Sequence, residues 1–452
     1  MEKNTQILAI AVIGIVIVAT AGTATFYVMN KDDSDKPFQT DSVAQVYGNA
    51  NNDFTVDSDD ADFIKSIVDG KTTWNSTANP FADANADGSI TEDDVDLVNK
   101  FIAGESCTVY YYDYWGDAAP LNLPISDLKI AVTYWQQGEE VGILGLWDKV
   151  VVANNSVFTS SSTSIYDTSG IKTIGTSGSS SSSVSSDAIQ VMMENDVNLL
   201  IASCYTSIHD KQAELQNVGI QSIFLWHAGS YCLSTILTLG VLLDQEENAQ
   251  KYVSYCDNIT DTIAERLNGA EKKDAIILMM YENEAERESK NGGICTYVNQ
   301  PEGAWVLMSN LVNPYTADPT NTSLGRSFYS VEWYMQNGDK FDYIIDIEES
   351  TGLDGTQEKY NERFEYNTST FLGKTDAYSE GKIVGTTYSF GGFAGYSSLM
   401  TLAWMLYPDL FSHEEAMESM QAYYDEFTNA SIDVNNRACY YTGDGYAALY
   451  LQ

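Results

Sequence analysis

The sequence predicts two α/β lobes joined by a long helix, preceded by a small all-α module and an N-terminal transmembrane helix. Three observations carry this prediction. An apolar run stands at the N-terminus, an acidic pattern is repeated between residues 49 and 94, and short apolar strands alternate with helices from residue 128 onward. Such alternation builds parallel α/β layers. The chain of 452 residues is long enough for two or three domains.

The N-terminal run, residues 7–28, contains no charged side chain. It is long enough to cross a bilayer as a helix, whereas the apolar core of a signal peptide is usually shorter. Lys3 precedes the run, and Asp32 and Asp33 follow it, which favours an exported body. We therefore predict an uncleaved membrane anchor over residues 1–29, with the body extracellular or periplasmic, and then a linker over residues 30–45. Cleavage near residues 21–24 is the alternative.

Composition excludes several classes of function. The formal net charge of −41 argues against a nucleic-acid partner, because phosphates require lysine and arginine. Only 3 histidines are present, so a histidine-rich metal site is not expected, while 30 tyrosines allow a tyrosine-lined binding surface. The sequence has no G-x-S-x-G, H-E-x-x-H or P-loop pattern. We therefore predict a protein that is not an enzyme.

Residues 49–60 and 83–94 carry the same pattern of oxygen-bearing side chains, the second copy 34 residues after the first. Ca²⁺ takes about six to eight oxygens, which a 12-residue loop supplies from positions 1, 3 and 5, a carbonyl at 7 and an acid at 12. Gly88 stands at position 6 of the second loop, where the chain must turn sharply, and Phe54 replaces it in the first. The predicted ligands are Asn49, Asn51, Asp53, Thr55 and Asp60, then Asp83, Asn85, Asp87, Ser89 and Asp94.

A calcium loop followed by a single helix, present twice, resembles the dockerin family over about residues 46–106. Position 12 is an aspartate where a standard EF-hand has glutamate. The resemblance implies that the module binds two Ca²⁺ ions through the ten residues above and docks onto a cohesin-like protein. The tyrosine-rich residues 107–126 are predicted to be a linker into the next domain, with an edge strand as the alternative.

The remaining elements follow in order. In an N-terminal lobe, residues 127–232, we predict strands at 128–132, 149–153, 197–203 and 221–226, and helices at 141–147, 187–195 and 209–219. A connecting segment, residues 233–270, is helical over 233–267 with a break near Asp244. In a C-terminal lobe, residues 271–452, we predict strands at 275–280, 341–347 and 382–387, and a helix within 397–411 that ends before Pro408.

This ordered set resembles the substrate-binding proteins of ABC importers for iron–siderophores and cobalamin, over about residues 127–415. The fragments that carry the resemblance are DAIQVMMENDVNLLIA, AELQNVGIQSIFL, LTLGVLLDQEENAQKYVSYCDNITDTI and GKIVGTTYSF with SLMTLAWMLYPDLF. The resemblance implies a metal chelate held between the lobes and an ABC permease as partner. It also implies that an acid on each lobe, Asp187 and Glu332, docks onto permease arginines.

Ligands of α/β lobes gather at the carboxyl ends of strands, so the residues that follow the strands are the candidates. They are Tyr134, Trp135, Gln136, Tyr205, Trp226, His227, Tyr388, Phe390 and Tyr396. Flat aromatic faces suit a macrocycle or an aromatic chelate, and His227 could be an axial ligand in a haem or corrinoid. Two alternatives stay open: a dockerin-bearing extracellular polysaccharide-active hydrolase, and a structural cell-surface protein.

Overall fold

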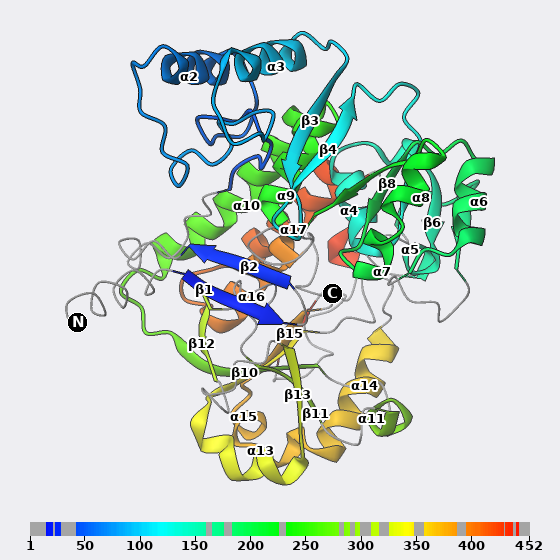
Figure 1. The fold of residues 1–452 in the computed structure, drawn as a ribbon. Helices are drawn as coiled ribbons and strands as arrows, with labels where there is room; N and C mark the ends of the chain where they lie inside the picture. Colours follow the sequence, from blue (N-terminus) through cyan, green and yellow to red (C-terminus); the bar gives the residue numbers. More distant parts are fainter. Residues whose placement is uncertain are drawn as a thin grey trace, which may run out of the picture.

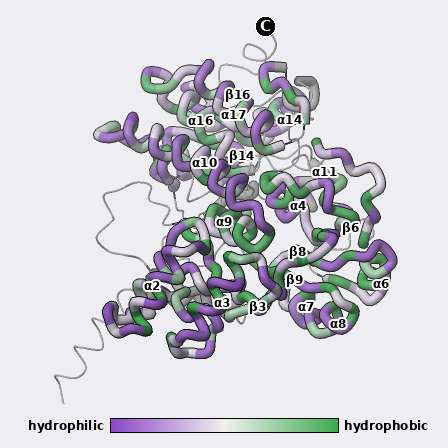
Figure 2. The backbone as a smooth tube through the Cα atoms, turned by 90° about the horizontal axis from the view of Figure 1, so that it is seen from above, coloured by the Kyte–Doolittle hydropathy of each residue, from purple (hydrophilic) through white to green (hydrophobic). Residues whose placement is uncertain are grey.

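The computed structural model describes residues 15–20, 23–28, 42–159, 165–175, 183–225, 232–279, 284–289, 294–298, 309–315, 325–347, 357–386, 395–428, 430–436 and 440–442. Figure 1 shows a small helical module in blue, one α/β lobe in cyan to green, and a second lobe in yellow to red. Seen from above, helix α9 lies among these three parts (Figure 2).

The module contains two helices, α2 (Ser58–Val68) and α3 (Glu92–Ile102). Each begins with a capping box. The N-cap side chain accepts from the backbone N–H of the N3 aspartate, and the side chain of that aspartate accepts from the backbone N–H of the N-cap residue. Each ends at a glycine with positive φ, Gly70 and Gly104, the usual conformation after a helix C-cap. Ile64 and Val98 are buried where the two helices pack. The prediction of one helix after each loop is confirmed.

The predicted transmembrane helix over residues 7–28 is wrong for its described part. Strands β1 (Ile15–Thr20) and β2 (Thr23–Val28) pair antiparallel, with Ile15 opposite Val28. The segment is rich in isoleucine, valine and threonine, whose β-branched side chains favour strands. Within the described residues, no helix has both the length and the apolar character needed to cross a membrane.

Residues 107–123 form a hairpin where we predicted a linker, so the edge-strand alternative holds. Strands β3 (Cys107–Tyr112) and β4 (Ala118–Leu123) pair antiparallel. On one side Tyr111 forms a bridge with Val46 of the module. On the other side the backbone N–H of Asn122 donates to the side chain of Gln221 at 2.7 Å. The hairpin therefore connects the module to the first lobe.

The N-terminal lobe contains a parallel sheet with strand order β7-β6-β5-β8-β9. Its strands are β5 (Ile130–Val132), β6 (Val150–Asn154), β7 (Lys172–Ile174), β8 (Leu199–Ala202) and β9 (Gln221–Phe224). Its helices are α4 (Trp135–Ile143), η1 (Trp147–Lys149), α5 (Asn155–Thr159), α6 (Ser186–Glu194), α7 (Thr206–His209) and α8 (Gln212–Asn217). The predicted helix at 141–147 was placed too late, since α4 begins at Trp135.

Two long helices, α9 (Cys232–Leu242) and α10 (Glu246–Arg266), lead to the second lobe. The predicted break is at Asp244, whose φ of 57° interrupts the helical path. The sheet beyond it has the order β13-β11-β10-β14-β15-β16, with β12 also beside β10. These strands are β10 (Lys273–Met279), β11 (Ile294–Val298), β12 (Val312–Pro314), β13 (Gly325–Tyr329), β14 (Tyr343–Ile347), β15 (Ile383–Thr386) and β16 (Tyr440–Thr442).

In this second sheet β10, β12, β14 and β15 run parallel, while β11, β13 and β16 are antiparallel to their neighbours. The helices of the lobe are α11 (Glu284–Ser289), α13 (Val331–Asn337), η3 (Gly338–Lys340), α14 (Gln357–Thr370), η5 (Leu372–Lys374), α15 (Asp376–Ser379), α16 (Gly395–Leu406), α17 (His413–Phe427) and η6 (Val434–Asn436).

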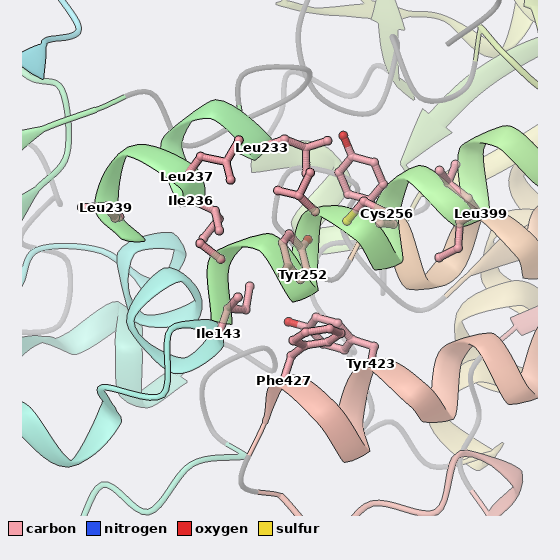
Figure 3. Close-up of a cluster of buried hydrophobic side chains, with 14 of the residues drawn as sticks. Ile143, Leu233, Ile236, Leu237, Leu239, Tyr252, Cys256, Leu399, Tyr423 and Phe427 are labelled. Carbon is pink, nitrogen blue, oxygen red and sulfur yellow. The ribbon is translucent and has the colours of Figure 1, made fainter. Parts of the chain in front are cut away.

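Helices α4, α9, α10, α16 and α17 share one apolar core between the lobes (Figure 3). Tyr252 of α10 packs edge-on against Phe427 of α17, with ring centroids 5.3 Å apart. At the far end of α10, the guanidinium of Arg266 donates two hydrogen bonds, of 2.7 and 3.0 Å, to the carboxylate of Glu415. Helix α17 thus fastens the interlobe helix at both ends.

Candidate ligand cleft and calcium loops

Thr133 and Ser203 link the carboxyl ends of two neighbouring strands, β5 and β8. Their hydroxyl oxygens lie 3.1 Å apart, and the backbone N–H of Ser203 donates to the hydroxyl of Thr133 at 2.7 Å. The Ser203 hydroxyl also donates to the side-chain oxygen of Gln137 at 3.3 Å. All three side chains are buried. Because the sheet is parallel, this network lies at the edge where ligands of such lobes bind.

Four predicted ligand residues lie at this edge. Tyr134 and Trp135 are half-buried, with ring centroids 5.6 Å apart, and Gln136 is half-buried beside them. Tyr205, just after β8, is 46 % exposed. The structure thus brings together the predicted residues of the first and third strands, and it leaves aromatic faces available at the surface. Their contact with a ligand stays a prediction.

The other predicted ligand residues either lie outside the described residues or belong to the core. Trp226, His227, Tyr388 and Phe390 lie outside the described residues. Tyr396 is on α16 and only 1 % exposed, so its ring belongs to the core.

Sequence reasoning missed two polar side chains of α4, the helix that follows the carboxyl end of β5. Glu139 and Glu140 are buried within α4. Burial, with Glu140 and Asp113 nearby, raises the pKa of the Cys204 thiol well above its ordinary value. The two adjacent acids before an apolar run, in the segment GEEVGIL, were the signal that could have found them.

The hairpin turn also reaches this edge. The backbone N–H of Tyr114 donates to the carbonyl of Phe224 at the end of β9, at 3.0 Å. The Trp115 ring lies 4.1 Å from the His209 ring, centroid to centroid. The hairpin therefore spans from the module to the ligand edge of the first lobe.

The two calcium loops have matching hydrogen bonds around their position-12 acids, Asp60 and Asp94, which are both fully buried. In each, one carboxylate oxygen accepts from the backbone N–H at position 3, at 3.0 and 3.1 Å. The other oxygen accepts from the helix N-cap residue, at 2.9 and 2.7 Å. Burial raises the pKa of Asp60 to about 6. A bound divalent cation would favour the charged carboxylate.

The position-1 residues show how the loops differ. Both carboxylate oxygens of Asp83 accept backbone N–H bonds, from Asp87 at 3.2 Å and from Gly88 at 2.7 Å. Asn49 accepts one such bond, from Asp53 at 3.1 Å, and its amide nitrogen donates to two backbone carbonyls, each at 2.8 Å. The asparagine therefore offers a cation one neutral oxygen, whereas the aspartate offers a charged group with two.

The donor set of each loop fits Ca²⁺. A carboxylate has about four lone-pair sites. Each oxygen of Asp83 accepts one backbone N–H bond, while Asp60 accepts two at Oδ1, from Ala50 at 2.7 Å and Asn51 at 3.0 Å, and one at Oδ2, so lone pairs remain for a cation in both loops. No three His, Cys, Asp or Glu side chains gather into a metal cluster anywhere in the described ranges. The loops would therefore hold a cation partly through amide and backbone oxygens, the hard ligands that calcium accepts.

A groove of about 490 Å³ lies where the module meets the body. Phe101 and Ile102 of α3 form one wall, Leu123 of β4 a second, and the α9–α10 corner around Asp244 a third. Backbone N–H groups just before the first loop also donate to Ser234 and Thr238 of α9, at 3.3 and 2.8 Å. The module thus packs directly on the helices that join the lobes.

The two acids predicted to dock on a permease are both exposed. Asp187 lies in the first turn of α6 on one lobe, and Glu332 lies in the first turn of α13 on the other. A serine N-cap precedes each of them. Their docking role stays a prediction.

These features define a two-lobed α/β binding-protein fold with a calcium-loop module packed on it. Comparison with known families agrees for the module, since residues 47–103 match the dockerin type I domain. The match includes both loops and both helices, α2 and α3.

Solved structures identify the fold of the body as that of TroA-like periplasmic binding proteins. The TroA-like protein FepB from Veillonella parvula has a TM-score of 0.55 and 13% identity, over 73% of this chain and 98% of that one. A periplasmic solute-binding protein from Veillonella parvula DSM 2008 has a TM-score of 0.53 and 14% identity, over 73% and 96%. Helicobacter pylori CeuE, solved with nickel and histidine, has a TM-score of 0.51 and 16% identity, over 72% and 97%. A comparison with curated proteins gives no match.

Proposed function

We propose that the protein is the extracytoplasmic substrate-binding protein of an ABC importer, which captures a metal chelate between its lobes without turning it over. The observation that carries the proposal is the pair of sheets, one parallel and one mixed, on either side of the α9–α10 connection, with aromatic side chains at the strand ends of the first lobe. The fold is shared with periplasmic binding proteins. Iron–siderophores, cobalamin and haem-like tetrapyrroles are the candidate ligands.

Tryptophan fluorescence tests this proposal. Ferric siderophores, cobalamin and haem are titrated in turn into the full chain, and a bound chromophore should quench Trp135. Trp135→Ala should weaken binding by about 1–3 kcal/mol if the ring covers the ligand, judging by the apolar area of a buried aromatic. Trp74→Phe in the module is the matched control and should leave affinity unchanged. If no member of the panel binds and polysaccharide is hydrolysed, the hydrolase alternative replaces the importer reading.

The module would bind Ca²⁺ and attach the protein to a cohesin-like partner. The support is the pair of matching loops and the dockerin type I match. Calorimetry of the full chain with Ca²⁺, before and after treatment with a chelator, measures the first part. Absence of heat in the chelator-stripped protein would contradict it.

Docking on the permease would use Asp187 and Glu332. Reversing both charges, Asp187→Arg with Glu332→Arg, should abolish uptake in a reconstituted importer while ligand binding persists. Glu194→Arg, at an exposed position on α6, is the control. Uptake that survives the double reversal would reject these two residues as the docking acids.

A further inference from the structure

We propose that the cleft takes a neutral or positively charged chelate, such as a ferric hydroxamate, and discriminates against a polyanionic one, such as a ferric tris-catecholate. The inference rests on the proposed function, because it names the class of ligand that the same cleft accepts. It is drawn from the charges of the first lobe.

The first lobe, residues 127–232, is poor in cations along its whole length. It contains no arginine, and its lysines are Lys129, Lys149, Lys172 and Lys211. Its acids outnumber them and are Asp127, Glu139, Glu140, Asp148, Asp167, Asp187, Glu194, Asp196, Asp210 and Glu214. A polyanion brought to this lobe meets a net negative field, which disfavours its binding.

The few lysines lie away from the ligand edge or are already paired. Lys129 and Lys149 come directly before β5 and β6, and Lys172 begins β7. In a parallel sheet these amino ends share one edge, opposite the edge that carries Thr133 and Ser203. The remaining lysine, Lys211, lies 2.6 Å from the carboxylate of Glu214.

The ligand edge itself carries carboxyl groups. Asp113 lies in the hairpin turn that reaches the end of β9, where its Oδ1 accepts the backbone N–H groups of Trp115 and Asp117, each at 2.9 Å. Glu140 is buried in α4, the helix that follows β5. A carboxyl group is negative or neutral but never positive, so neither protonation state supplies a counter-charge for a polyanion. An approaching cation is attracted by the negative charge of the Asp113 carboxylate, and more strongly near a partly buried edge than in bulk water.

The neutral donor at this edge is Gln137. Its side chain is fully buried, its oxygen is bonded to Ser203, and its amide nitrogen has no hydrogen-bond partner among the described residues. A buried N–H without an acceptor is costly, and an oxygen from a ligand or a water would remove that cost. A hydroxamate or amide oxygen meets this need without an added charge.

The second lobe does not reverse this balance. Residues 271–452 contain 28 aspartates and glutamates against 11 lysines and arginines. Arg287 on α11 donates from its Nε to the hydroxyl of Tyr366 of α14 at 3.1 Å.

Two probes of opposite charge decide the question. Ferrioxamine B, a cationic ferric hydroxamate, and ferric enterobactin, a trianionic tris-catecholate, are titrated into the full chain by tryptophan fluorescence. We expect the hydroxamate to bind at least about tenfold more tightly at low ionic strength, and the difference to shrink at high salt because charges are screened. Equal or tighter binding of the catecholate overturns the inference and leaves the proposed function standing. If neither probe nor cobalamin nor haem binds, the proposed function falls and the inference with it.

Variants that change one charge show which part of the first lobe discriminates between the two chelates. Gln136→Lys places a cation at the half-buried ligand edge and should raise the affinity for ferric enterobactin by about fivefold or more. Gln190→Lys adds the same charge on the exposed face of α6 and is the control. In a second pair of variants, Glu140→Gln removes a carboxyl group from α4, and Glu194→Gln removes one from the exposed surface of α6 as the control. Thermal melts check that each variant folds. If the edge variants and the surface variants change the affinity for ferric enterobactin equally, the inference that charge at the ligand edge selects the chelate is overturned.

Discussion

Replacing Tyr111 with phenylalanine should destabilise the protein by about 2 kcal/mol. The Tyr111 side chain is fully buried, and its hydroxyl accepts the backbone N–H of Phe224 at 3.2 Å and donates to the carbonyl of Ser222 at 3.3 Å. Phenylalanine keeps the ring but leaves one N–H and one carbonyl without a partner. Each orphaned group costs about 1–3 kcal/mol, and the length of both bonds points to the lower end of that range.

The free energy of unfolding is measured by urea titration, followed by circular dichroism, for the parent protein and the variant. Tyr110→Phe is the matched control, because the neighbouring Tyr110 side chain is half-buried and on the other face of β3. We expect that control to change stability by less than about 0.5 kcal/mol. If Tyr111→Phe is equally harmless, its hydroxyl does not hold the hairpin to β9, and the link between module and lobe must lie elsewhere.

Three further outcomes are expected. Asp83→Ala should reduce calcium affinity in calorimetry more than Asn49→Ala does, because a carboxylate is lost rather than a neutral amide; the reverse order would contradict the ligand assignment. Arg266 holds the pKa of Glu415 at about 2, below its ordinary 4.5, so the pair stabilises above pH 4.5 and loses its effect as pH falls toward 2. The two side chains are 34% and 41% exposed, so Glu415→Gln should cost only about 0.5–1 kcal/mol at pH 7 and nothing at pH 2 in urea melts. Gly48→Ala should lower the melting temperature, because φ there is 111° and an added Cβ would lie 3.1 Å from a core methyl; an unchanged melt would refute that.

The features that the sequence predicted well are set by local spacing. Asp60 and Asp94 occupy equivalent loop positions, and everything that they bond lies within twelve residues of chain. The break at Asp244 was also local, since a polar Asp-Gln-Glu segment interrupts an apolar helix. Alternation alone predicted β5, β6, β8 and β9 of the first lobe and β10, β14 and β15 of the second, but not β7, β11, β12, β13 or β16.

The features that the sequence did not predict depend on partners far along the chain. The hairpin was taken for a linker because its stabilising contacts, such as Tyr111 with Phe224, join residues more than a hundred positions apart. Helix α4 was misplaced because residues 137–143 are buried on every side, which removes the polar face that would mark its start. The run before Val28 was ambiguous, since apolar residues suit either a helix or a strand until pairing decides.

The bridge between Val46 and Tyr111 also has a mechanical consequence. A load applied to the module would not first straighten a loose tether. It would pass through backbone hydrogen bonds of 2.9 Å between Tyr47 and Tyr110 and between Tyr112 and Gln45, and from β3 into β9. A pull on the calcium module would therefore strain the sheet close to its carboxyl edge, which carries Thr133 and Ser203.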